Sequence, residues 1–186
     1  MKKEVKNKLD DVLEQNRDEN GRFIVDMMIL DDSSFISPFC GGAPVVSQEV
    51  ATYLDNAIKN VPPKGEITLH ISSDVIAKDK ESIHIQSIKN YYCNERKQLI
   101  RELISNKLAS FTMFFIGLVI IAVMIVFSLK EVKEIWITVL EIIGWVFVWE
   151  AVDKFVFERN SLKKNLLRAN QLINAKVVFK KINKGN

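Results

Sequence analysis

The sequence predicts an α+β protein in which a small helix-strand-helix-strand domain is joined by a long helix to a two-helix transmembrane hairpin. Two apolar runs, at 111–129 and 135–152, are separated by only the short charged segment KEVKE. Both follow a region that alternates strand-like and helix-like patterns. A hairpin of two helices is a thin membrane domain, so we expect the chain to be oligomeric.

Charge divides the chain into regions. Residues 1–105 carry 17 Asp/Glu against 14 Lys/Arg, whereas residues 153–186 carry 9 Lys/Arg against 2 Asp/Glu. The N-terminal residues lack the apolar core of a signal peptide, so the first region is expected to stay in the cytosol. The expected organisation is a cytosolic ligand-binding domain at 1–78, a connecting helix at 79–110, the hairpin at 111–152 and a basic cytosolic tail at 153–186.

Four elements are expected in the first domain. Residues 2–15 have helical spacing of apolar residues, and RFIVDMMIL at 22–30 is typical of a strand buried on both faces. A second helix starts at Ser47, a good N-cap, and EITLHISS at 66–73 alternates like a strand with one solvated face. A connection of this length favours a parallel crossover. Since two strands alone make a weak sheet, a third is expected, with a neighbouring subunit as one possible source.

A long helix connects this domain to the hairpin. Helical periodicity resumes near Asp79, and neither Gly nor Pro occurs between Gly65 and Gly117. We therefore expect one helix to run into the first apolar span. Such a helix could transmit motion from the cytosolic domain to the membrane hairpin, or it could serve as a passive stalk.

The flanks of the hairpin predict its orientation. The run at 111–129 has no charge and approaches the roughly 20 residues needed to cross about 30 Å of hydrocarbon. Lys and Arg are concentrated before the first run and after the second, with only Lys130 and Lys133 between the runs. Both termini are therefore expected to face the cytosol.

Three carboxylates lie in or beside the second run. Glu141 is about six residues from the outer end, where an isolated charge costs several kcal/mol. An oligomer whose helices line a wet pore would solvate it, so Glu141 is a candidate pore residue. Glu150 and Asp153 share a different face, and we expect them at the cytosolic mouth, with Glu150 able to pair with Lys154. The alternative is a protonated or snorkelling Glu141 in a hairpin that serves only as an anchor.

No pattern of residues predicts catalysis. The sequence has no nucleophile motif, no phosphate-binding glycine loop and no acid–base pair in a recognisable context. A zinc site would have to combine Cys40, Cys93, His70 and His84, but none of these has metal-site spacing. We expect no catalytic, cofactor or metal site, and the chain is not predicted to be an enzyme.

A nucleic-acid surface is one interpretation of the aromatic and basic residues around the strands. Stacking rings combined with cations can hold a single strand. The candidates are Arg22, Phe35, Phe39, Lys59 and Lys64. The alternative is that the phenylalanines belong to the core and the cations are solvated, and the net negative charge of the domain argues against a general nucleic-acid surface.

The segments FISPFCGGAP and VPPKGEITLHI precede a hairpin that ends in EIIGWVFVWEAVDKFVFERNSLKK. This layout resembles the membrane effectors of small bacterial anti-phage operons, and more narrowly the effector of the Hailong defence system, over the whole chain. The resemblance implies a homo-oligomeric ion channel in the bacterial inner membrane, here expected to be tetrameric. It also implies that a single-stranded DNA oligomer, made by a partner nucleotidyltransferase, holds the channel closed. Loss of the DNA would open the pore and arrest growth.

A second function class remains open. In it the hairpin conducts no ions and anchors an adaptor or scaffold that recruits a cytosolic partner, while the basic tail lies on the anionic lipid bilayer. Ion conductance distinguishes the two classes.

Overall fold

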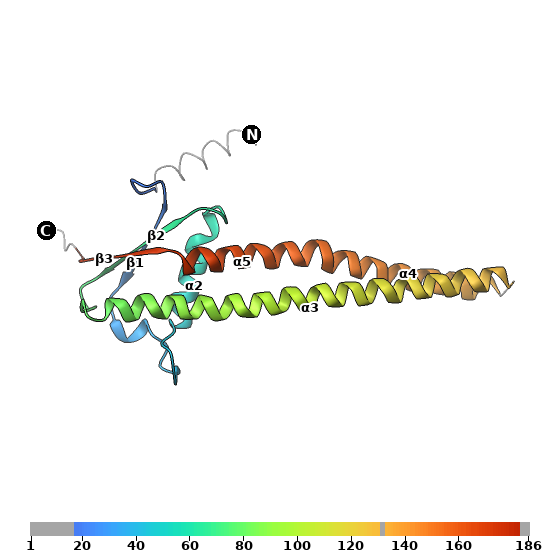
Figure 1. The fold of residues 1–186 in the computed structure, drawn as a ribbon, viewed down its shortest axis with the longest axis horizontal. Coiled ribbons are helices and arrows are strands. Elements are labelled where there is room, and N and C mark those ends of the chain that lie inside the picture. Colours follow the sequence, from blue (N-terminus) through green and yellow to red (C-terminus); the bar gives the residue numbers. More distant parts are fainter. Residues whose placement is uncertain (1–16, 131–132, 183–186) are drawn as a thin grey trace. The chain divides into compact units, whose positions relative to one another are not determined.

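The computed structural model describes residues 17–130 and 133–182. It combines helices and strands, and it divides into two compact units. The first unit comprises Met1–Lys97 with Leu167–Asn186, and the second comprises Gln98–Leu166. The expected helix at 2–15 lies outside the described residues. The elements of each unit are labelled in Figure 1.

The first unit contains a three-stranded parallel sheet in the order β1-β2-β3. Strand β1 (Phe23–Ile29) pairs with β2 (Ile67–Ser73), as the expected crossover requires. The third strand, β3 (Lys176–Lys180), pairs with the other edge of β2. The chain therefore supplies its own third strand, from the segment expected to be a basic tail. The basic composition of this segment gave no indication of a strand, although its central residues Val177, Val178 and Phe179 are partly buried.

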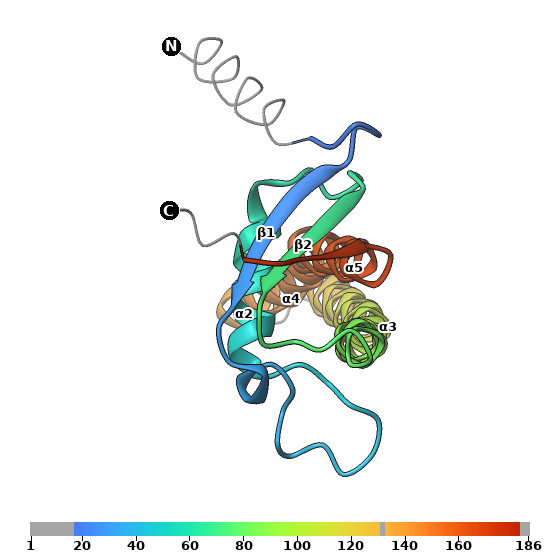
Figure 2. The same cartoon turned by 90° about the vertical axis from the view of Figure 1, so that its left-hand side faces the viewer.

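Helices cover one face of this sheet, as Figure 2 shows for α2 (Gln48–Ala57), the last turns of α5 (Arg159–Ile173) and the first turns of α3 (Glu81–Leu129). Ser47 is the N-cap of α2, because its side chain accepts a hydrogen bond from the Val50 N–H. Short 3₁₀ turns follow β1 and α2 in the chain: η1 (Asp32–Ser34) and η2 (Ile58–Asn60). The covered face is the core of the unit.

The two faces of β1 differ, which corrects the expectation that both are buried. Phe23, Val25, Met27 and Ile29 are buried, whereas Met28 on the opposite face is 62% exposed. The parallel register places each of the four buried residues of β1 beside a buried residue of β2. Only one face of the strand is therefore buried. Because the exposed face also carries apolar residues, the composition of the strand resembles that of a strand buried on both faces.

The second unit is a helical hairpin, seen edge-on in Figure 1. The long helix expected from residue 79 is confirmed, since α3 continues without a break to Leu129. Helix α4 (Glu134–Asp153) returns beside it, followed by the π-helical turn η3 (Lys154–Glu158) and then by α5. By length and composition, α3 and the continuous helix Glu134–Ile173 are each able to cross a membrane.

Candidate functional site

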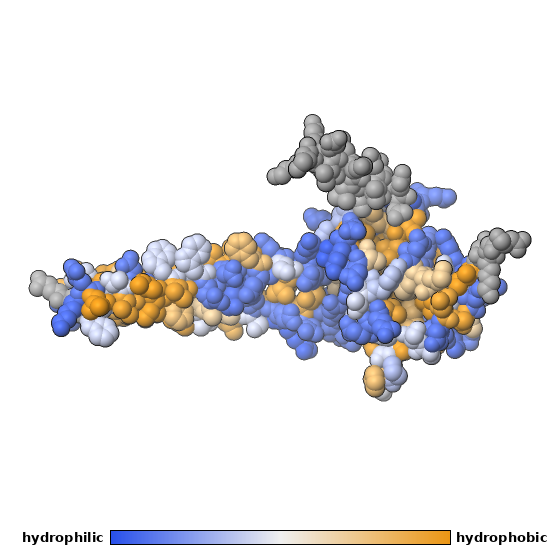
Figure 3. Space-filling view, turned by 180° about the vertical axis from the view of Figure 1, so that it is seen from behind, coloured by the Kyte–Doolittle hydropathy of each residue, from blue (hydrophilic) through white to orange (hydrophobic). Residues whose placement is uncertain are grey.

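A narrow seam joins the two helices of the hairpin. Most of the less exposed residues of α3 in this unit recur at steps of three and four. They are Leu99, Leu103, Asn106, Ala109, Ser110, Met113, Gly117, Ile120, Ile121 and Met124. This spacing is that of one helix packed along one stripe by another. Elsewhere the hairpin exposes apolar side chains, and Figure 3 shows them over its outer surface. Only 6% and 11% of the two most apolar stretches are buried.

The three candidate pore residues fall into two groups. Glu141, Glu150 and Asp153 are all exposed on α4. Glu150 forms the expected ion pair with Lys154, at 3.3 Å, and Lys154 lies equally close to Glu158. Glu141 forms no ion pair within residues 17–130 and 133–182. Nine positions separate Glu141 from Glu150, so the two side chains project from nearly opposite sides of the helix.

A polar site, not foreseen from the sequence, lies where η3 interrupts the regular helix. The Asn106 side chain donates a hydrogen bond of 2.9 Å to the Lys154 carbonyl oxygen. Around it is an open groove of about 500 Å³, whose lining includes Glu102, Ser105, Lys154 and Glu158. Single π-helical turns are often found at functional sites. The one sequence signal was Asn106 in a stripe whose other members, apart from Ser110, are apolar or glycine.

The two candidate stacking residues have opposite environments. The Phe35 side chain is completely buried (0% exposed), with its ring centroid 4.6 Å from that of His84. It therefore offers no face to a nucleobase and belongs to the core, as the alternative interpretation held. Phe39 is 93% exposed on the loop that follows. The ends of that loop are held together by a bridge between Ile36 and Val46.

Two of the three candidate cations lie together. Arg22 and Lys64 line one groove of about 370 Å³, whose walls also include Asn170 and Gln171 of α5. Arg22 is already paired with Glu66 at 2.8 Å. Lys59 is not among the residues lining this groove, and its ammonium group donates to the Asn56 side chain instead. The structure therefore brings together Arg22 and Lys64, but not all five candidates.

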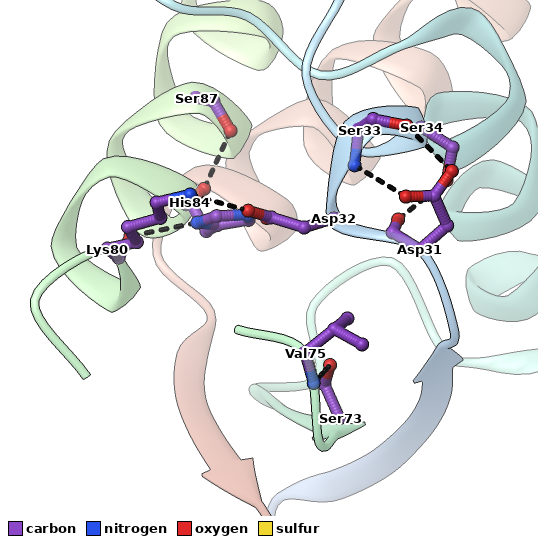
Figure 4. Close-up of polar contacts among 9 residues, drawn as sticks. All are labelled: Asp31, Asp32, Ser33, Ser34, Ser73, Val75, Lys80, His84 and Ser87. Atoms are coloured by element: carbon purple, nitrogen blue, oxygen red, sulfur yellow. Dashed lines mark hydrogen bonds and ion pairs between the residues drawn. The ribbon is translucent and has the colours of Figure 1, made fainter. Parts of the chain in front are cut away.

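Sequence reasoning missed a polar cluster around the buried His84, beyond the carboxyl ends of β1 and β2, drawn in Figure 4. Asp32 of η1 lies 2.9 Å from the Lys80 ammonium and 2.7 Å from Nε2 of His84. His84 Nδ1 lies 2.8 Å from the Lys80 carbonyl oxygen. The hydrogen bond from Lys80, assisted by His84, holds the pKa of Asp32 below its usual value of 3.8.

This cluster is suited to joining segments rather than to proton transfer. His84 is 1% exposed and both of its ring nitrogens already have partners. No substrate could therefore reach a free ring nitrogen. Among the described residues, no three His, Cys, Asp or Glu side chains come together as metal ligands.

The face of the sheet opposite the helices carries a second polar cluster. Nδ1 of His70, on the central strand, lies 3.2 Å from Asp26 Oδ1 on β1 and 3.1 Å from the Lys180 ammonium on β3. These three residues lie far apart in the sequence, and the pairing of the three strands assembles them. No spacing in the sequence could have connected them.

No protein-family model, curated protein or solved structure matches this chain. The resemblance to Hailong effectors therefore enters below only as part of a proposal.

Proposed function

We propose that this chain is a homo-oligomeric ion channel of the bacterial inner membrane, gated by a ligand on its cytosolic unit, and that its opening arrests growth in anti-phage defence. The observation that carries the proposal is the exposed Glu141 carboxylate within an apolar, largely unburied hairpin. A hairpin that buries only one seam has no interior in which to solvate a charge.

Strand pairing supports the proposed topology. Strand β2 precedes the two apolar helices and β3 follows them, yet the two strands belong to one sheet. Both strands must therefore lie on the same side of any membrane, which requires an even number of crossings between them. Two spans, with both flanks on the Lys/Arg-rich cytosolic side, meet this requirement.

Glu141 supports a pore in preference to a bare anchor. Placing an isolated carboxylate at this depth costs several kcal/mol on insertion scales. In a ring of subunits, of which four is the expected number, each Glu141 would face water and attract cations. Glu150, paired with Lys154, and Asp153 would lie at the cytosolic mouth.

The ligand part of the proposal comes from the resemblance. A single-stranded DNA oligomer made by a partner nucleotidyltransferase would bind the cytosolic unit and hold the channel closed. The groove lined by Arg22 and Lys64 offers cations, and the exposed Phe39, which is not among the residues lining that groove, offers one stacking ring. Phe35 no longer contributes to this surface. Such a ligand gates only if it binds the closed and open states with different affinities.

Planar-bilayer recording of the purified full-length chain tests the channel. We expect cation-selective current in the wild type, and altered selectivity or flux in Glu141→Gln. The matched control is Glu134→Gln, at the first position of α4. Absence of current from correctly assembled, ligand-free protein would reject the channel, and an unchanged current in Glu141→Gln would remove Glu141 from the pore.

One observation favours the second function class, an anchored adaptor or scaffold. Phe39 is almost fully exposed on a loop closed by a backbone bridge, which is the form of a protein-binding tip. In that case the same recordings would show no current, whereas Phe39→Ala would release a cytosolic partner protein.

A further inference from the structure

A second groove of the hairpin, about 290 Å³ in volume, is lined almost entirely by apolar side chains. Ser110 of α3 and Ala151 of α4 are small and buried in the seam. The larger side chains of Phe111, Phe114 and Phe155 contribute to its walls. The Ser110 hydroxyl donates to the Asn106 carbonyl oxygen, so it offers the groove little unsatisfied polarity. The groove therefore suits a hydrocarbon chain.

Positive charge lies at one end of this groove. The Arg159 guanidinium is 5.0 Å from the centroid of the Phe155 ring, which lines the groove. Arg159 has no carboxylate partner in the part of the chain that the structure describes. Lys154, by contrast, is held between Glu150 and Glu158. Lys107 lies one helical turn before Phe111 and adds a second exposed cation at this end.

We infer that this groove binds an anionic phospholipid, with an acyl chain between α3 and α4 and the phosphate on Arg159. The inference rests on the membrane location in the proposed function, but not on conduction. In that location the groove occupies the cytosolic end of the hairpin, with its apolar part toward the bilayer and Arg159 at headgroup depth. A guanidinium without a carboxylate partner can donate two parallel hydrogen bonds to one phosphate.

The turn η3 contributes to the shape of this site. Phe155 and Val156 belong to the π-helical turn, and both line the groove. The Asn106 amide, bonded to the Lys154 carbonyl, braces the same turn. The turn η3 therefore both accepts the hydrogen bond from Asn106 and lines the apolar groove.

Native mass spectrometry of the detergent-purified, full-length protein tests the inference. Phosphatidylglycerol and phosphatidylcholine with identical acyl chains would be titrated in parallel. We expect the wild type to prefer phosphatidylglycerol, and Arg159→Gln to weaken its binding about tenfold without changing phosphatidylcholine binding. Lys163→Gln, an exposed cation further along the same helix, should leave both unchanged.

A second pair of variants examines the acyl-chain part. Val156→Trp would fill the groove at its exposed rim and should weaken the binding of both lipids. Val146→Trp, at an exposed position of α4 that does not line the groove, is the matched control and should change neither.

Three results would overturn the inference: no preference between the lipids, full phosphatidylglycerol binding in Arg159→Gln, or a Val156→Trp variant that loses oligomers instead of lipid. The last result would mean that a second copy of the chain occupies the groove. The outcomes are independent of the bilayer recordings. A protein that binds phosphatidylglycerol but carries no current would reject only the channel, and a conducting protein without lipid preference would reject only this site.

Discussion

Gly117 and Gly144 face one another across the hairpin. A Cβ atom added to Gly117 would lie 3.3 Å from the Gly144 carbonyl oxygen and 3.0 Å from Val148 Cγ2. A Cβ on Gly144 would lie 3.0 Å from Ile121 Cγ1. The two backbones therefore approach so closely that even a Cβ atom would make a tight contact with the facing helix, although neither glycine belongs to a GxxxG pair.

Enlarging either glycine should separate α3 from α4. We expect Gly117→Leu and Gly144→Leu each to lower the free energy of unfolding by about 1–3 kcal/mol, because the added side chain has no space in the seam. Denaturant titration of the detergent-solubilised protein measures this. Val146→Leu, at an exposed position of α4, should have little effect. Wild-type stability in both glycine variants would contradict this packing of the hairpin.

The environments of Phe35 and Phe39 predict opposite results for the same substitution. Phe35→Ala should cost about 3–5 kcal/mol of stability, because it empties a fully buried site beside His84. Phe39→Ala should change stability by no more than about 0.5 kcal/mol. Thermal unfolding of the two single variants measures both effects. Loss of oligonucleotide binding in Phe39→Ala at unchanged stability would support a role for this ring, whereas the same loss in Phe35→Ala would reflect unfolding.

The Asp32 ion pairs should make stability depend on acidity. Because the pKa of Asp32 is lower in the folded chain than its usual 3.8, its contribution is fully present above about pH 4. It is then lost as the pH falls through the lower, folded value. Asp32→Asn should therefore unfold at a lower temperature than the wild type at neutral pH, and this difference should shrink below about pH 4.

Melting curves of both proteins over this pH range measure the effect. Asp79→Asn, at an exposed position next to Lys80, is the control and should run parallel to the wild type. A difference between Asp32→Asn and the wild type that stays constant down to the lowest pH would mean that the ion pairs contribute nothing.

Strand β3 can be tested by its direction of hydrogen bonding. The Phe23 N–H donates to the Glu66 carbonyl, and alternation through the parallel register directs the Val178 N–H toward β2 and the Val177 N–H away from it. Val178→Pro removes a ladder donor, so it should destabilise the first unit more than Val177→Pro does. Hydrogen exchange of the β2 amides measures this. Equal protection in the two variants would argue against the pairing of β3 with β2.

The elements predicted best were those with a continuous local pattern. Ser47 starts α2, alternation marks β2, and the absence of Gly and Pro after Gly65 gave the length of α3. The failures involve partners distant in sequence. His70 contacts Lys180, 110 positions away, and Asp32 contacts His84, 52 positions away. Periodicity carries no information about such pairs, and it could not distinguish a buried Phe35 from an exposed Phe39.

The place of β3 in the chain imposes an order on biosynthesis. Strands β1 and β2 leave the ribosome early, but the strand that completes their sheet emerges only after both long apolar helices have been made. Until then the edge of β2 that pairs with β3 lacks this partner, and an unpaired strand edge invites aggregation. The three-stranded sheet can therefore be complete only after the whole segment from β1 to β3 has been synthesised. A chain that ends within the hairpin would keep an unpaired edge on β2, which proteases could recognise.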